Sequence, residues 1–142
     1  MWYPELPVAT ILQQRNSLIG LLYGLFLSRM IGLVDYYLAS VLKSRFGHLE
    51  KSGSSWDAFF QKTKIDLLAR KNGPLVYSLL QERHKIEHNK AQIDQTFVDR
   101  MMKKGITHSY AAGDSIQKSH LDVLAARDAI REFVADVDCL MT

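Results

Sequence analysis

Residues 74–89 read PLVYSLLQERHKIEHN, and this stretch indicates the fold more clearly than any other part of the chain. Pro74 suits the first turn of a helix, because its missing N–H would have no partner there in any case. Apolar residues then recur at the spacing of one helix face. They are Leu75, Val76, Leu79, Leu80 and Ile86. The stretch therefore predicts a helix from Pro74 to about Asn89, apolar on one side and highly charged at its end.

The sequence before this stretch predicts two further helices. Apolar residues recur at helical spacing from about Ile11 to Phe46, and Gly47 is suited to end that helix. Its periodic positions are Leu18, Leu22, Leu25, Phe26, Leu33, Tyr36, Tyr37 and Val41, and we expect a buried core helix. The glycines at 20, 24 and 32 predict a bend or close packing on a neighbour. After a loop at 47–55, Ser54 or Ser55 is suited to cap a helix over Trp56–Arg70. Its inward residues are expected to be Trp56, Phe59, Phe60 and Leu67.

The sequence after the central stretch predicts two more helices. Asp94 is a good N-cap for a helix through Phe97, Val98 and Met101 that Gly105 ends. Ser119 and Asp122 resemble a capping box at the start of a last helix, which runs to about Leu140. Its inward face is Val123, Ala126, Ile130, Phe133, Val134 and Val137. We therefore expect one domain over residues 1–142, an all-α antiparallel bundle of four to five helices.

Positive charge is concentrated in the middle of the chain. The net formal charge is only +3, but residues 61–104 hold ten Lys/Arg against five Asp/Glu, whereas residues 105–142 hold three against six. A basic middle segment suits a phosphate-bearing partner, although solvated helix surfaces explain such charges equally well.

The single cysteine and the apolar N-terminal run indicate where in the cell the protein is expected. Cys139 alone excludes an internal disulfide and a cysteine-based zinc site, and its apolar surroundings predict core packing. The run SLIGLLYGLFLS at residues 17–28 has an uncharged core too short to span a bilayer. The opening residues MWYPELP lack the basic start of a signal peptide. We therefore expect a cytoplasmic protein without a membrane segment.

The end of the central helix, ERHKIEH at residues 82–88, fits a zinc-hydrolase pattern. His84 and His88 lie four residues apart, which places two potential zinc ligands on one helix face, with Glu87 as the base of an H-x-x-E-H enzyme. A catalytic zinc needs a third protein ligand. The candidates, none in a recognisable ligand context, are Glu132, His108 and His120. The basic residues at 83 and 85 also disfavour a dication, so we expect no metal and no cofactor.

The same letters fit metal-free RNA cleavage. A histidine such as His88 can take the ribose 2′-hydroxyl proton because its pKa lies near neutrality. An arginine such as Arg83 can grip a phosphate in two places. The two are five residues apart, about 140° around a helix, so they do not share one stripe. Both can still reach a common cleft if the helix end lies at its mouth and the arginine stem bends over. The structural alternative is an ordinary ion pair between Arg83 and Glu87, with both histidines solvated.

The stretch resembles the signature of the HEPN family, small all-α domains with an R-x4–6-H motif. The resemblance rests on Arg83-His84, Ile86, His88-Asn89, Ile93-Asp94 and the aromatic Phe97. It is specific over about residues 79–98, and the order of the helices extends it over most of the chain. Relatives often carry glycine in the turn after the histidine, where this chain has Lys90-Ala91.

This resemblance implies a homodimer in which two motifs face a shared cleft at the two-fold axis. It implies a metal-independent endoribonuclease in which His88 is the general base, Arg83 holds the scissile phosphate and His84 orients the phosphate or the base. The products would be a 2′,3′-cyclic phosphate and a 5′-hydroxyl. Many such enzymes are toxins, which adds a cognate antitoxin as an expected partner, or act in phage defence. A catalytically silent domain that binds RNA or protein is the alternative. Residues expected to attract RNA are Lys85, Asn89, Lys90, Arg100, Lys103 and Lys104.

Overall fold

The computed structural model describes residues 7–47 and 54–142, and most of them are helical. The elements are α1 (Val8–Phe46), α2 (Ser55–Thr63), the short 3-10 helix η1 (Leu67–Ala69), α3 (Gly73–His88), α4 (Gln95–Lys103) and α5 (His120–Met141). The described residues contain no strand, only an isolated antiparallel bridge between Gln92 and Ser115. The predicted all-α class is confirmed. The predicted loop at 47–55 lies largely outside the described residues.

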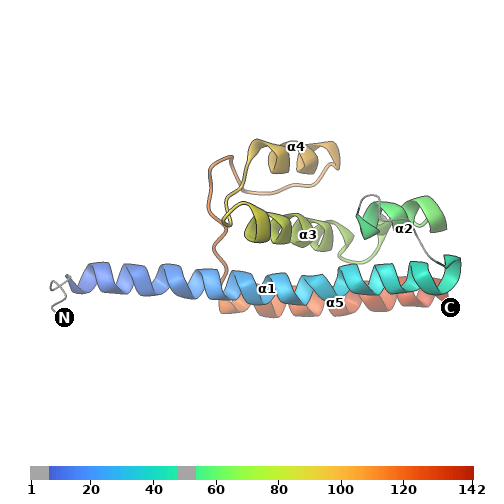
Figure 1. Ribbon diagram of the computed structural model, residues 1–142, viewed down its shortest axis with the longest axis horizontal. Helices are drawn as coiled ribbons and strands as arrows, with labels where there is room; N and C mark the ends of the chain where they lie inside the picture. The colour runs from blue at the N-terminus through green and yellow to red at the C-terminus, as the bar shows by residue number, and fades with distance from the viewer. Residues whose placement is uncertain (1–6, 48–53) are drawn as a thin grey trace.

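The 39-residue helix α1 is the longest element; α2, α3 and α5 pack along it, whereas α4 lies on the other side of α3 (Figure 1). Helix α3 runs antiparallel to α1, because Arg83 near its C-terminal end lies beside Gly32 and the later residue Ile86 lies beside Gly24. Helix α5 runs parallel to α1. Its first residue, His120, lies 6.2 Å from Tyr23 between ring centroids. The prediction of an antiparallel bundle is therefore wrong for this pair, because residues 89–119 carry the chain back to the middle of α1 before α5 begins.

Helix α1 buries a different face from the one that the sequence pattern indicated. The buried residues are Gly20, Gly24, Leu27, Ser28, Ile31, Val34, Leu38 and Leu42. Most of the predicted positions are exposed instead: Leu18, Leu22, Leu25, Phe26, Leu33 and Tyr36. No residue from 8 to 19 is buried. By length and composition α1 could cross a membrane, and 33% of its most apolar window is buried within the protein.

The helix ends follow local chemistry that the sequence made visible. Ser54, Asp94 and Ser119 are the N-caps of α2, α4 and α5, and Ser119 forms the predicted capping box with Asp122. Gly47 ends α1 with a φ of 76°. Each of these predictions is confirmed.

Three other local predictions are wrong. Helix α2 ends at Thr63, seven residues before the predicted Arg70, because Lys64 adopts the left-handed conformation. Phe60 and Leu75, expected to face inward, are 49% and 45% exposed. Cys139 is exposed, although its neighbours are apolar.

Aromatic packing fixes α2 against the rest of the bundle. Trp56 stacks on Phe133 of α5 at 5.7 Å between ring centroids and meets the edge of Tyr77 of α3 at 5.3 Å. Phe59 is fully buried beside them. The N-terminus of α2 is thereby held close to the middle of α3.

Candidate active site

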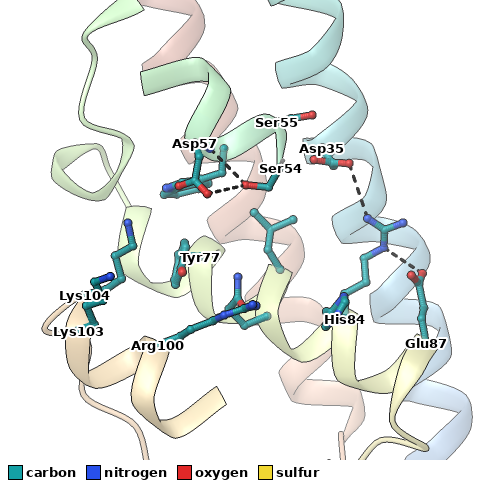
Figure 2. Close-up of a pocket in the computed structure, with 14 residues that line it drawn as sticks. Asp35, Ser54, Ser55, Asp57, Tyr77, His84, Glu87, Arg100, Lys103 and Lys104 are labelled. Atoms are coloured by element: carbon teal, nitrogen blue, oxygen red, sulfur yellow. Dashed lines mark hydrogen bonds and ion pairs between the residues drawn. The ribbon is translucent and has the colours of Figure 1, made fainter. Parts of the chain in front are cut away.

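Arg83 is held at the seam between α3 and α1. Its Nε donates to Glu87 Oε1 at 3.0 Å, and its Nη1 lies 4.0 Å from Asp35 Oδ2 of α1 (Figure 2). The hydroxyl of Ser28 donates to the same Glu87 oxygen at 3.0 Å. The expected Arg83–Glu87 pair is therefore confirmed, and α1 adds a second carboxylate that the sequence did not reveal. The Arg83 side chain remains 29% exposed, so part of the guanidinium reaches solvent.

A pocket of about 710 Å³ opens beside Arg83, between α3, α4 and the N-terminus of α2 (Figure 2). Five of its lining side chains are basic, and three are acidic. The basic ones are Arg83, His84, Arg100, Lys103 and Lys104, and the acidic ones are Asp35, Asp57 and Glu87. The pocket thus brings two of the three predicted catalytic residues together with three of the six predicted RNA-binding residues.

Three basic residues at the end of α4, including its C-cap residue Lys104, differ from Arg83 in having no carboxylate partner among the described residues. Within residues 7–47 and 54–142, no carboxylate forms an ion pair with Arg100, Lys103 or Lys104. Arg100 Nη1 donates to Gln81 Oε1 at 3.1 Å, and Lys104 Nζ lies 5.6 Å from the Tyr77 ring centroid. Their positive charges are therefore available to an anion in the pocket.

The other three predicted RNA-binding residues lie outside this pocket. Lys85 is buried, and its Nζ lies 2.8 Å from Asp94 Oδ2, so its charge is neutralised inside the protein. Asn89 Nδ2 donates to the carbonyl of Gln92 at 2.8 Å and closes the turn after α3. Lys90 is exposed and borders a separate, mostly apolar hollow. Lys85 therefore stabilises the fold, and its buried ammonium group is not placed to contact RNA.

The two histidines of the motif differ in environment. His84 lines the pocket, whereas His88, the last residue of α3, is 64% exposed in its side chain and is not among the lining residues. Their ring centroids are 4.9 Å apart. Burial, followed by the electrostatic influence of the basic side chains Lys85, His88 and Arg100, lowers the pKa of His84 below 6.5. At neutral pH His84 is therefore mostly neutral and able to accept a proton or a hydrogen bond.

The turn after α3 adopts the conformation that glycine favours without containing glycine. Lys90 and Ala91 have φ angles of 52° and 59°. The amide of Ala91 donates to the carbonyl of Lys85 at 3.0 Å, which caps the end of α3. The departure from the glycine of the HEPN signature therefore does not prevent a left-handed turn at this place.

A zinc site finds no support in the described residues. No three His, Cys, Asp or Glu side chains there gather closely enough to hold a metal ion. The candidate third ligands have other neighbours. His108 packs on Phe97, His120 lies near Tyr23, and Glu132 accepts a hydrogen bond from Asn72.

Sequence reasoning missed the residues that reach the pocket through tertiary contacts. Gln81 and Tyr77 belong to the recognised α3 stretch but gave no signal of their own, and Asp57 was hidden in the first turn of α2. The class that fold and site define is an all-α helical bundle with a basic-walled pocket. Comparison with protein-family models, with curated proteins and with solved structures finds no match.

Proposed function

We propose that the protein is a metal-independent endoribonuclease of the HEPN type. The observation that carries the proposal is the shared pocket, where Arg83 and His84 lie with Arg100, Lys103 and Lys104. Cations without acidic partners attract a polyanionic backbone whatever its base sequence. The arginine supplies a phosphate ligand, and the neutral His84 beside it can orient the substrate by hydrogen bonding.

The proposed reaction is transfer of the phosphodiester to the neighbouring ribose oxygen. His88 takes the 2′-hydroxyl proton and the 2′-oxygen attacks phosphorus. The bond from phosphorus to the 5′-oxygen then breaks, and the leaving 5′-oxygen takes up a proton from water. Arg83 stabilises the negative charge that builds on the phosphate oxygens. His84, 4.9 Å from His88 between ring centroids, orients the phosphate or the base. The products are a 2′,3′-cyclic phosphate and a 5′-hydroxyl, and no step needs a metal.

The proposal includes assembly and biological role. His88 stands at the end of α3, outside the pocket of its own chain, so a homodimer with both α3 ends at one cleft would bring more than one motif to the RNA. A cytoplasmic toxin controlled by an antitoxin, or a phage-defence effector, is the role in keeping with such chemistry.

RNA cleavage in EDTA tests the activity. Wild-type protein should convert RNA to fragments with 2′,3′-cyclic phosphate ends, which are identified by mass spectrometry. Arg83→Ala and His88→Ala should lower the cleavage rate by about a hundredfold or more, as expected when a general base or a phosphate ligand is lost. The matched controls are Arg131→Ala and His120→Ala, which remove an exposed arginine and an exposed histidine outside the pocket. Equal cleavage by all five proteins would refute the assignment.

A catalytically silent RNA-binding domain is the second candidate, and one observation favours it. Arg83 is already engaged by Glu87 and Asp35, and His88 lies outside the pocket. Under this alternative, wild-type protein binds labelled RNA without cutting it. Binding should then weaken in Lys103→Ala/Lys104→Ala and stay unchanged in His88→Ala.

A further inference from the structure

Helix α1 has a second apolar face, which no other part of the described chain covers. Six of its residues define what we call the outer stripe, each between 50% and 66% exposed: Ile11, Leu18, Leu22, Leu25, Phe26 and Leu33. Between residues 8 and 36, ten large apolar side chains are at least 43% exposed. At roughly 100 Å² each they present on the order of 1,000 Å² per chain, more than the roughly 300–600 Å² of the largest patch on a typical monomer.

The spacing of the outer stripe is that of a helix–helix seam. Ile11, Leu18 and Leu25 are seven residues apart, and Leu22 lies four residues after Leu18. A seven-residue repeat of apolar side chains keeps them on one side of a helix, where they pack against the same pattern on a neighbour. The opposite side of α1 is occupied by the core, so the helix cannot rotate to hide the stripe without exposing residues such as Ile31.

The charges on α1 favour a protein partner over a lipid bilayer. Arg15 and Arg29 lie within the stripe, and only thirteen residues separate them, whereas a bilayer requires about twenty consecutive apolar residues. From Gly20 onward the same helix is packed against the rest of the bundle. A seam between helices tolerates such arginines, because their stems cover apolar neighbours while the guanidinium groups reach solvent.

A second copy of this chain satisfies both the area and the geometry. A standard interface buries about 800 Å² per partner, and the ten exposed apolar side chains between residues 8 and 36 can supply that area. Residues 8–19 project beyond α3 and α5 (Figure 1), so an antiparallel partner covers the apolar side of this projection with its own α1. A parallel pairing instead sets Arg15 against Arg15 and Arg29 against Arg29. An antiparallel pairing avoids this unless the two-fold axis passes through one of the arginines.

A mostly apolar hollow beside the stripe gives such a partner a place to insert a side chain. It measures about 300 Å³ and lies between α1 and α3, next to Leu21, Leu25 and Ile86. The size of an interface alone does not determine affinity, and a pocket that accepts an apolar anchor is the usual site of the strongest contacts.

We propose that two copies of this chain associate through the outer stripe of α1, with the helices antiparallel. The surface is distinct from the α3 ends that carry Arg83 and His88, and the proposal does not rest on ribonuclease activity. It predicts a stable homodimer through α1 in the absence of RNA, and pairing of the α3 ends is a second association that is expected only on RNA.

The experiment measures molar mass by light scattering and sedimentation equilibrium over a range of protein concentrations. Wild-type protein should have twice the chain mass of 16.2 kDa. Leu22→Glu should raise the dimer dissociation constant by about a hundredfold or more, because two apolar contacts are lost and two charges are placed in the seam. The matched control is Leu121→Glu, which alters an exposed leucine at the start of α5 and should remain dimeric. Because Leu22 is 56% exposed, its variant should keep wild-type circular dichroism.

Three results would overturn the proposal. The first is a wild-type monomer at every concentration. The second is a dimer that Leu22→Glu leaves intact. The third is a monomer that floats with phosphatidylcholine–phosphatidylglycerol vesicles and loses this binding in Leu22→Glu, since the stripe would then contact lipid. RNA cleavage by wild-type protein is scored separately, so failure of the dimer and failure of the ribonuclease proposal are distinguishable.

Discussion

Replacing Lys118 by methionine would expose the energetics of a buried ion pair behind the candidate site. Lys118 Nζ lies 2.6 Å from Glu82 Oε2, and the two side chains are only 12% and 8% exposed. Methionine keeps most of the apolar stem but leaves the Glu82 carboxylate without a counter-charge in the interior. Breaking such a pair on one side costs about 3–5 kcal/mol. The total free energy of unfolding of a domain is about 5–15 kcal/mol, so the loss should be plain.

The protonation state of Lys118 agrees with a charged pair. Burial lowers the pKa of Lys118, but the Glu82 carboxylate and its hydrogen bond more than offset burial, so the pKa is raised above 10.5. The ammonium group is therefore charged at neutral pH. A raised folded-state pKa contributes stability that is fully present below pH 10.5 and is lost as pH rises through the folded-state value.

Urea unfolding followed by far-ultraviolet circular dichroism gives the measurement. The comparison is wild type, Lys118→Met, Glu82→Leu and the double variant. The double variant should recover most of the loss, because an apolar pair replaces an ion pair at little net cost. The matched control is Lys71→Met, which removes the exposed Lys71–Glu132 pair at 3.6 Å and should cost less than about 1 kcal/mol. Should Lys118→Met cost no more than Lys71→Met, or the two single losses simply add, the pair does not stabilise the fold as argued.

Three further predictions concern the ends and turns of α3. Lys90→Gly should raise the free energy of unfolding by about 0.5–1 kcal/mol, because glycine accepts a φ of 52° without strain; thermal unfolding measures it. Gly73→Ala should lower it by about 1–3 kcal/mol, because the added Cβ would collide with backbone carbonyls of η1, whereas Gly24→Ala, which meets only a side-chain methyl at 3.7 Å, should be tolerated. The hydrogen bond from Lys85 lowers the pKa of Asp94 below 3.8. The ionised Asp94 carboxylate therefore contributes stability that is lost as pH falls through the lowered pKa. Asp94→Asn should make the free energy of unfolding, measured by urea titration, less dependent on pH in the acid range.

The parts of the fold that were predictable depend on neighbours in the sequence. The caps at Ser54, Asp94 and Ser119 use side chains that accept hydrogen bonds from amides three residues later, so both partners are visible in a short stretch of sequence. The early end of α2 was missed because no glycine or proline marks it. Lys64 takes a left-handed conformation there, which its residue type gives no reason to expect.

The candidate site was predictable only in its local half. Arg83 and Glu87 are one helical turn apart, so their pairing follows from spacing alone. Asp35 and Arg100 come from other helices, and their approach to Arg83 depends on how α1 and α4 pack on α3. The burial of Lys85 is of the same kind, since its partner Asp94 caps the next helix across a turn of unusual conformation.

The buried face of α1 was predicted wrongly because both faces of the helix are apolar. Helical periodicity shows that apolar residues line a face, but it does not show which of two apolar faces is buried. One signal did distinguish them. Small residues recur every four positions at Gly20, Gly24, Ser28 and Gly32. Such a row lets a neighbouring chain approach the helix closely. The structure places Gln117 against the first, Ile86 and Glu87 against the next two, and Arg83 against the last. The row of small residues therefore marks the face of α1 that packs against the rest of its own chain. The large apolar side chains on the opposite face stay exposed, and they are the surface proposed to bind a second copy.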